Sequence, residues 1–353
     1  MPQLTYLEVR GSPFETGRAL GHFGASAMHD YSRRSPAWAT VMRHRGSTLA
    51  RDMATAVRVG FPLVWDELQG LALGLELPFE DVFLWNCRGD LWAMAPDGCT
   101  TVQEAGSTRR ITHNEDGDPA FAGHCAIAAC EVYDGVTFAS FVYPGSLPGH
   151  TFAVTERGLA MTVNNLRCLK VRPGVPRMVL ARALLDTACL DDALVLLQST
   201  ERAGGFHLTL AHRDARGLFS VEFSSEVCSV QEISGRALHA NHALHARLGD
   251  FPQTVTASSL HRQQRGEALL AAGDKQAPDP LQLLADHEDA VFPILREHPA
   301  DSDGENTMAT ADIRVGPTRI EWQVHEHPAL PPCFHMIDAH ANTQEHHGDH
   351  SPA

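Results

Sequence analysis

The sequence changes character at residue 99, and this change limits the fold more than any other feature. Residues 1–98 carry mainly helical periodicity, which predicts helices over residues 14–32, 37–57 and 63–75. Beyond residue 99, short strand-like runs alternate with turn residues. The expected strands span residues 110–113, 136–143, 151–155, 159–163, 206–211, 218–223, 227–233, 308–315 and 319–324.

Residues 176–199 and 258–272 return to helical spacing, and residues 114–119 (NEDGDP) have the composition of a dense turn. Strands, a helical insert, further strands and then helices predict an α+β layered domain rather than alternating βαβ units. Its sheets are expected to be largely antiparallel, with helices packed outside them.

Composition excludes several classes of function. The 353 residues carry a formal net charge of −15, which argues against binding nucleic acid or an anionic membrane. We find no signal peptide at the start and no apolar run long enough to span a bilayer, so the cytoplasm is the expected location. The eight cysteines form no CxxC pair, and most are expected to be reduced and buried.

The segment Pro96-Asp97-Gly98-Cys99-Thr100-Thr101 has the composition that intramolecular peptide cleavage requires. Gly98 has no side chain, so its carbonyl is open to attack and the bond tolerates strain. The Cys99 thiol can attack that carbonyl, and water can then hydrolyse the resulting thioester. The product is a free α-amine on Cys99 with a pKa of about 8, which can serve as the general base beside the thiol. The four residues GCTT alone also fit an inert packing cysteine.

Further segments accompany this motif in a fixed order along the chain. They are Gly11-Ser12-Pro13-Phe14-Glu15-Thr16-Gly17, Leu84-Trp85-Asn86-Cys87-Arg88-Gly89-Asp90, His113-Asn114-Glu115-Asp116, Gly158-Leu159-Ala160-Met161-Thr162-Val163-Asn164, His239-Ala240-Asn241-His242 and Ser259-Leu260-His261-Arg262. Together with GCTT, they resemble the isopenicillin-N acyltransferase family of autoproteolytic N-terminal-nucleophile enzymes. The resemblance runs from about Arg10 to Pro328. Asp90 stands where the family usually has Glu, and Ala240 replaces a Thr.

The resemblance implies a four-layer αββα sandwich and a set of roles. Cys99 matches the nucleophile, and Asn241 matches an oxyanion-hole residue whose amide is typically worth about 3 kcal/mol. Asp116 matches the carboxylate that orients the freed amine, and Arg262 matches a buried arginine that holds the carboxylates of the site. Asn164 or Asn165 is the second polar candidate, and the backbone N–H of Asn165 is a donor in either case.

Other patterns in the sequence favour structural readings. His239, His242 and His245 have a spacing that could suit a metal, but they have no acidic or Cys partner nearby in sequence. Residues 145–149 (GSLPG) have the wrong spacing for a nucleophile elbow, and no Walker loop or GxGxxG segment occurs. Residues 339–353 form a polar, His-rich tail that is expected to be disordered, with His346, His347 and His350 as an adventitious metal site.

These observations predict a self-cleaving cysteine amidohydrolase that acts on a linear amide through an acyl-enzyme, without cofactor or metal. Residues 1–98 would be a helical small subunit that stays associated with the catalytic large subunit of residues 99–338. The expected partner is a small-molecule amide or acyl donor, and a homo-oligomer stays open. Acyl transfer from a thioester or amide to an amine is the alternative within this chemistry. A self-processing binding protein without turnover is the alternative of another class.

Overall fold

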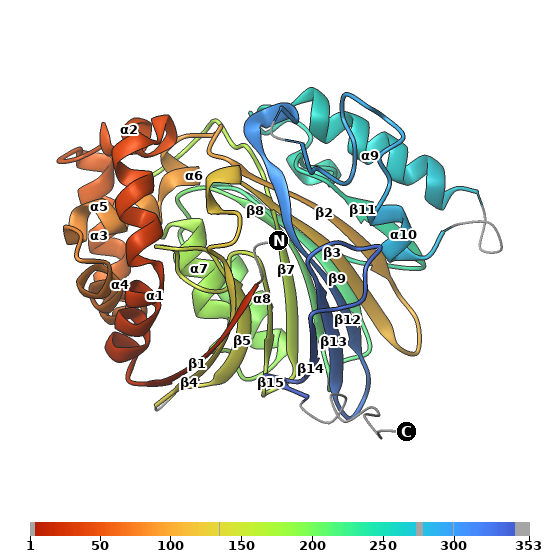
Figure 1. Ribbon diagram of the computed structural model, residues 1–353, viewed down its shortest axis with the longest axis horizontal. Helices are drawn as coiled ribbons and strands as arrows, with labels where there is room; N and C mark the ends of the chain where they lie inside the picture. The colour runs from red at the N-terminus through yellow and green to blue at the C-terminus, as the bar shows by residue number, and fades with distance from the viewer. Residues whose placement is uncertain (1–3, 134, 273–277, 299, 343–353) are drawn as a thin grey trace, which may run out of the picture.

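Two β-sheets packed face to face form the centre of the protein, with helices outside both sheets (Figure 1). The computed structural model describes residues 4–133, 135–272, 278–298 and 300–342. Phe152 of one sheet contacts Trp322 of the other edge-to-face, with ring centroids 6.3 Å apart. The predicted α+β architecture with four αββα layers is therefore confirmed.

The first sheet has eight strands in the order β1-β4-β5-β6-β7-β8-β9-β10. Their bounds are β1 Thr5–Gly11, β4 Ala126–Val132, β5 Thr137–Val142, β6 Phe152–Thr155, β7 Leu159–Asn165, β8 Phe206–His212, β9 Leu218–Phe223 and β10 Cys228–Glu232. Neighbouring strands are antiparallel except β1 and β4, which are parallel. Every residue of β7 is buried, because the second sheet covers one face of the strand and helices cover the other.

The second sheet has seven strands in the order β11-β2-β3-β12-β13-β14-β15, and all its pairings are antiparallel. Their bounds are β2 Asp97–Glu104, β3 Arg109–Gly117, β11 Arg236–His239, β12 Asn306–Val315, β13 Ile320–His325, β14 Phe334–Ile337 and β15 His340–Ala341. The short β11 lies beside β2, so β2 is paired along both of its edges.

The helices form two outer layers (Figure 1). On the side of the first sheet lie α1 Pro13–Arg34, α2 Pro36–Met42, α3 Thr48–Gly60, α4 Pro62–Leu75, α5 Phe79–Trp85, α6 Arg88–Leu91, α7 Arg177–Leu184 and α8 Leu190–Ser199. On the side of the second sheet lie α9 Ala257–Leu270 and α10 Pro280–Leu284. Among the described helices, none combines the length and the hydropathy that crossing a bilayer requires.

Most of the expected elements are present. The helix predicted over residues 14–32 is α1, where Ser12 and Glu15 form a capping box. The helix over residues 63–75 is α4, and those within 176–199 are α7 and α8. The helix predicted over 37–57 is split, because Gly46 adopts a φ of +65° and Ser47 caps α3. No strand range was predicted for β1, β2, β4, β11, β14 or β15.

One prediction was wrong in a way that bears on the site. Residues 114–117 are not part of a turn: they extend β3, where β2 and β12 pair with them on both sides. Strand pairing thus overrides their turn-like composition. The segment 1–98 holds α1 to α6, and it also contains β1 of the first sheet and the start of β2 at Asp97. Residues 340–341 of the predicted tail form β15, and residues 343–353 lie outside the described residues.

Candidate active site

Cys99 is the third residue of β2, and only 4% of its surface is exposed. In the pairing of β2 with β3, Glu115 lies opposite Cys99 and Asp116 lies opposite Gly98. The other predicted residues come from the end of β7 in the first sheet, from the segment after β11 and from α9. The structure therefore gathers side chains from distant parts of the chain around one end of β2.

Asn241 is in direct contact with the Cys99 backbone. Its side-chain oxygen accepts a hydrogen bond from the Cys99 N–H at 3.1 Å and another from Nη2 of Arg262 at 2.7 Å. Because a guanidinium group only donates hydrogen bonds, Arg262 fixes the orientation of the Asn241 amide. The Nδ2 group is then the donor end, and it donates to the carbonyl of Asn165 at 3.3 Å.

Arg262 is buried and holds the backbone of the site. Its Nη1 donates to the Cys99 carbonyl and to the Thr100 hydroxyl, each at 2.7 Å. Burial and the neighbouring Arg296 lower the pKa of Arg262 to about 10. The sequence suggested that Arg262 holds the carboxylates of the site, whereas its hydrogen bonds here go to the Cys99 carbonyl, to Asn241 and to hydroxyl groups.

The two adjacent asparagines at the end of β7 do different things. The Asn164 side chain accepts a hydrogen bond from the Thr101 hydroxyl at 2.7 Å and donates to the His239 carbonyl at 3.0 Å. The Asn165 side chain donates to the carbonyl of Asp97 at 2.8 Å, one residue before Gly98. Asn165 thus binds the segment that precedes Cys99, and Asn164 binds a side chain two residues beyond it.

Asp116 lies in a pocket of opposite charge beside Gly98. Its Oδ1 accepts a hydrogen bond from the Thr307 hydroxyl at 2.7 Å, and its Oδ2 lies 3.6 Å from Nη1 of Arg296. That Oδ2 has no hydrogen-bond partner among the described residues. Burial raises the pKa of Asp116, against the opposing effects of Arg296 and Arg262.

Gly98 is required by close approach. A Cβ atom at Gly98 would lie 2.2 Å from Oε2 of Glu305 and 2.8 Å from Nη1 of Arg296. These two side chains form an ion pair in which both are buried, and Arg167 also donates to Glu305 at 2.8 Å. Glycine at this position therefore lets the buried ion pair pack against the bond between residues 98 and 99.

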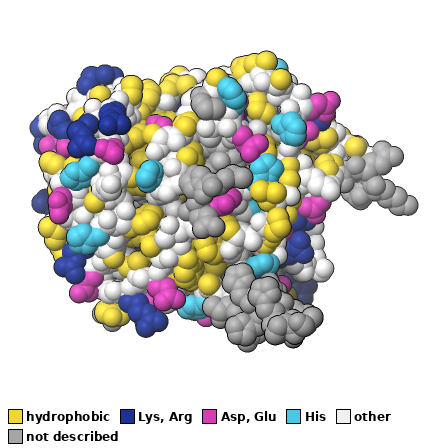
Figure 2. Space-filling view, viewed as in Figure 1, with side chains coloured by type: hydrophobic (Ala, Val, Ile, Leu, Met, Phe, Trp, Pro, Cys, Tyr) yellow, Lys and Arg dark blue, Asp and Glu magenta, His cyan; other side chains and the backbone are white. Residues whose placement is uncertain are grey.

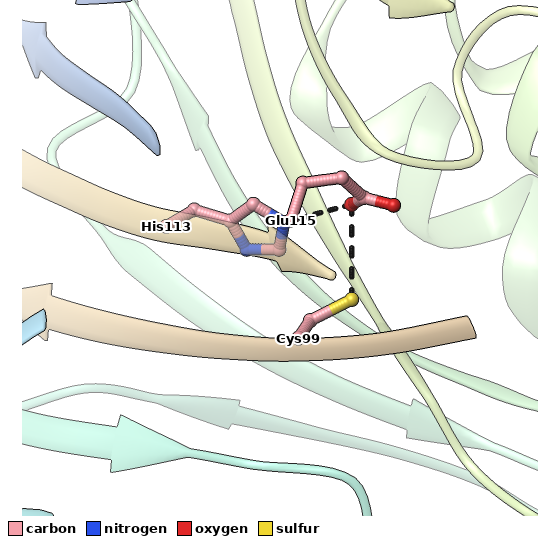
Figure 3. Close-up of side chains that lie close together, drawn as sticks. All are labelled: Cys99, His113 and Glu115. Carbon is pink, nitrogen blue, oxygen red and sulfur yellow. Dashed lines mark hydrogen bonds and ion pairs between the residues drawn. The ribbon is translucent and has the colours of Figure 1, made fainter. Parts of the chain in front are cut away.

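Glu115 and His113 form the immediate surroundings of the Cys99 thiol (Figure 3). The thiol donates to Oε2 of Glu115 at 3.7 Å, and Nε2 of His113 lies 3.1 Å from the same oxygen. Burial raises the pKa of the thiol well above its usual value; Glu115 and Asp116 act in the same direction, and the backbone N–H of Asn165 acts against them. Burial also raises the pKa of Glu115 and lowers that of His113 to about 3. Burial thus favours the uncharged form of each of the three groups.

The segment before Cys99 is held by buried ion pairs. Arg88 donates to Asp97 at 2.7 Å and, with Arg177, keeps the pKa of Asp97 low despite burial. The cavity that borders Asp97 and Tyr143 has a volume of about 10 Å³, which is room for a single water molecule. The cavity as it stands has no room for a substrate.

Sequence reasoning missed His113, Glu115, Arg296 and Glu305 as site residues. His113 and Glu115 are two positions apart in β3, so their side chains share one face of the strand. The interpretation of residues 114–119 as a turn concealed this spacing. Arg296 and Glu305 lie in the segment between α10 and β12, where the sequence carries no periodic signal.

The histidines weighed as metal ligands have other partners. Nε2 of His239 lies 2.9 Å from Glu222, Nδ1 of His242 lies 2.8 Å from the Ser259 hydroxyl, and Nε2 of His245 lies 3.0 Å from the Ser220 hydroxyl. His239 has no acidic neighbour in sequence, and its carboxylate partner Glu222 comes from β9.

On the molecular face in Figure 2, the described acidic side chains are scattered among basic and apolar ones.

Comparisons with known sequences give a family match and two similar curated proteins. The sequence model of the family "Acyl-coenzyme A:6-aminopenicillanic acid acyl-transferase" matches residues 103–328. The chain is 23% identical to a β-alanyl-dopamine/carcinine hydrolase of Drosophila melanogaster, over 86% of this chain and 88% of that protein. It is 24% identical to the 40 kDa form of acyl-coenzyme A:6-aminopenicillanic-acid-acyltransferase of Emericella nidulans, over 84% and 85% respectively.

Two solved structures also show similarity to this chain. A Caenorhabditis elegans orthologue of N-acylethanolamine-hydrolyzing acid amidase is 12% identical, with a TM-score of 0.40 over 66% of this chain and 94% of that one. Penicillin V acylase of Agrobacterium tumefaciens is 16% identical, with a TM-score of 0.31 over 67% and 77%. On the family match, which spans more than half of its length, this chain belongs to the acyl-coenzyme A:6-aminopenicillanic acid acyl-transferase family and is an enzyme of its amide hydrolase and acyltransferase class.

Proposed function

We propose that the chain cuts itself between Gly98 and Cys99 and that the freed Cys99 hydrolyses a linear amide through an acyl-enzyme. The observation that carries this proposal is the hydrogen bond from the Cys99 N–H to Asn241. That nitrogen would become the α-amine, so the atom needed as a base in turnover is already held beside the thiol.

In the first step, the Cys99 sulfur attacks the Gly98 carbonyl and the Cys99 nitrogen leaves as an amine, which gives a thioester. Water hydrolyses the thioester and leaves a carboxylate on Gly98. Release of this new chain end from the hydrogen bond between Asn165 and Asp97 would open the small cavity that borders Asp97. Cutting would thus free the base and make room for a substrate.

In turnover, the α-amine takes the thiol proton and the sulfur attacks the amide carbonyl of the substrate. Nδ2 of Asn241, oriented by Arg262, donates to the developing oxyanion, and the backbone N–H of Asn165 beside the thiol is the second donor. Asp116 supports the positive charge of the amine after proton transfer. The Cys99 ammonium group returns the proton to the leaving amine of the substrate, and water then hydrolyses the thioester, which releases the acyl group as a carboxylic acid and restores the thiol.

Hydrolysis is our first choice, and acyl transfer to an amine is the alternative. The Drosophila relative is named as a hydrolase and the Emericella relative as an acyltransferase, so both reactions are represented among similar proteins. We therefore take β-alanyl amides, and simple acyl amides of the same amines, as the first substrates to test. A new amide that outruns hydrolysis when a competing amine is added would favour transfer.

The test combines intact mass with activity for the wild type, Cys99→Ala and Asn241→Ala. We expect the wild type to yield two pieces and Cys99→Ala to stay at 38.5 kDa. Asn241→Ala should fold normally and lose about 10²–10³-fold in kcat. A wild-type chain that stays whole while hydrolysing amides would refute the freed-amine mechanism. A Cys99→Ala chain that is still cut would refute the nucleophile. A wild type that cuts itself but turns over no substrate would favour a self-processing binding protein.

A further inference from the structure

Four side chains on one face of β2 and β3 form a compact block around the thiol. Cys99 pairs with Glu115 and Thr101 pairs with His113 across the two strands. The donor atoms of Cys99, His113 and Glu115 all lie within 4.8 Å of one another (Figure 3). A thiol sulfur, an imidazole nitrogen and a carboxylate oxygen are the three ligand types that Zn²⁺ uses in proteins.

The spacing of these atoms fits a tetrahedral ion. Metal–ligand bonds of about 2.0–2.3 Å place neighbouring ligand atoms about 3.3–3.7 Å apart. The sulfur lies 3.7 Å from Oε2 of Glu115, and Nε2 of His113 lies 3.1 Å from that oxygen. The Glu115–His113 edge would have to lengthen by a few tenths of an ångström, and the Cys99–His113 edge lies within the 4.8 Å that encloses all three atoms.

A chain of hydrogen bonds sets which nitrogen of His113 is free to bind. Nδ2 of Asn164 donates to the His239 carbonyl, so Oδ1 of Asn164 is the acceptor for the Thr101 hydroxyl. Because the Thr101 hydroxyl donates its proton to Asn164, it accepts a hydrogen bond from Nδ1 of His113, 2.8 Å away.

In neutral His113, Nε2 therefore carries the lone pair, and it points toward Glu115. This is how the second nitrogen of a metal-binding histidine is typically fixed.

The charge balance also suits a divalent ion. When all three groups are uncharged, the Glu115 carboxyl and the Cys99 thiol each carry one proton. An ion of charge +2 that displaced these two protons would bind a thiolate, a carboxylate and a neutral imidazole. The buried block would then be neutral both with the ion and without it, which avoids the cost of an uncompensated charge in the interior.

We propose that Cys99, His113 and Glu115 bind one divalent ion of the Zn²⁺ type, and that the bound ion blocks the enzyme. Thiolate and imidazole ligands favour Zn²⁺ over Mg²⁺ or Ca²⁺. The ion would bind the sulfur lone pair that otherwise attacks the carbonyl, so it would stop both self-cleavage and turnover. This inference rests on the proposed function only in taking Cys99 as the nucleophile.

The test uses full-length protein in which His346, His347 and His350 are replaced by Asn, so that the tail does not bind metal. Co²⁺ is the probe, because its charge-transfer absorption reports a thiolate ligand, and Zn²⁺ should displace it. We expect one ion per chain. Cys99→Ala should lose the thiolate band, and Glu115→Gln should bind Co²⁺ at least about 100-fold more weakly. Thr101→Val keeps all three ligands and removes the group that orients His113, so it should weaken binding about 10–100-fold.

Cys125→Ser is the matched control, because its thiol is also buried and donates to the Phe121 carbonyl at 3.5 Å. It should leave Co²⁺ binding unchanged. A thiolate band that persists in Cys99→Ala, disappears in Cys125→Ser or never forms would overturn the metal site. If Thr101→Val bound Co²⁺ as tightly as the protein from which it is made, that result would also overturn the metal site.

Self-cleavage and amide turnover are measured in EDTA on the same samples. Activity in EDTA without a thiolate band would remove the metal site and keep the proposed function. A thiolate band without self-cleavage or turnover in EDTA would refute the proposed function and keep the metal site. If both hold, added Zn²⁺ should inhibit turnover reversibly, and Thr101→Val should need about 10–100-fold more Zn²⁺ for the same inhibition.

Discussion

Glu67 of α4 and Arg182 of α7 form an ion pair between the two parts of the chain that the proposed cut would separate. Nε of Arg182 lies 2.8 Å and 3.1 Å from the two carboxylate oxygens, and both side chains are at most 2% exposed. Glu67→Gln keeps the shape of the side chain and removes its charge. Arg182 cannot lose its proton, so a buried positive charge would remain with less compensation.

Removing one partner of a buried ion pair typically costs about 3–5 kcal/mol. Arg182 also lies 3.0 Å from Asp186, whose side chain is 33% exposed, so we expect the lower end, about 3 kcal/mol. An unfolding entropy of about 2.1 cal/mol/K per residue gives about 0.74 kcal/mol/K for 353 residues. Glu67→Gln should therefore lower Tm by roughly 4 °C.

Calorimetry and urea unfolding of wild type and Glu67→Gln measure this difference, with Asp30→Asn as control. Asp30 pairs with Arg33 on the surface, where both side chains are more than half exposed. The control should change the free energy of unfolding by less than about 0.5 kcal/mol. A loss below about 1 kcal/mol in Glu67→Gln would refute the reasoning that this pair holds the two parts together. In cut protein, the variant should also release residues 1–98 more readily on size exclusion.

Two further substitutions test other features. Gly98→Ala would place a methyl group against Glu305 and Arg296, so it should cost about 1–3 kcal/mol in urea unfolding and slow self-cleavage. Gly60→Ala, whose Cβ would meet nothing within 4 Å, should be tolerated, and equal effects of the two would contradict the packing argument. Burial and the charge of Arg88 lower the pKa of His150 to about 3, so the unfolded chain binds the extra proton between pH 3 and about 6.5. Stability should therefore fall as pH falls through this range, and His150→Gln should reduce the slope by up to about 1.4 kcal/mol per pH unit. Urea unfolding between pH 4 and 7 checks this, and an unchanged slope would refute it.

Local sequence signals were sufficient where one segment decides its own structure. The capping box of Ser12 and Glu15 marks the start of α1, and the turn at Gly158, with a φ of +104°, separates β6 from β7. Local sequence signals failed where pairing with other strands decides the secondary structure. Residues 114–117 have turn-like composition, and β1 is a short strand among helices; both are strands because neighbours from elsewhere in the chain bond to them.

The sequence by itself determined the layered α+β class, the family resemblance and the candidates Cys99, Asn241, Asp116 and Arg262. Only the tertiary structure decided what each of them contacts. Arg262 reaches the Cys99 carbonyl and Asn241 from a helix 163 residues away in sequence, and Glu305 packs against Gly98 from a loop. Periodicity and motifs report on neighbours along the chain. Hydrogen bonds and desolvation in a buried site depend on neighbours in space, and these raise the pKa values of the thiol and Glu115 and lower that of His113.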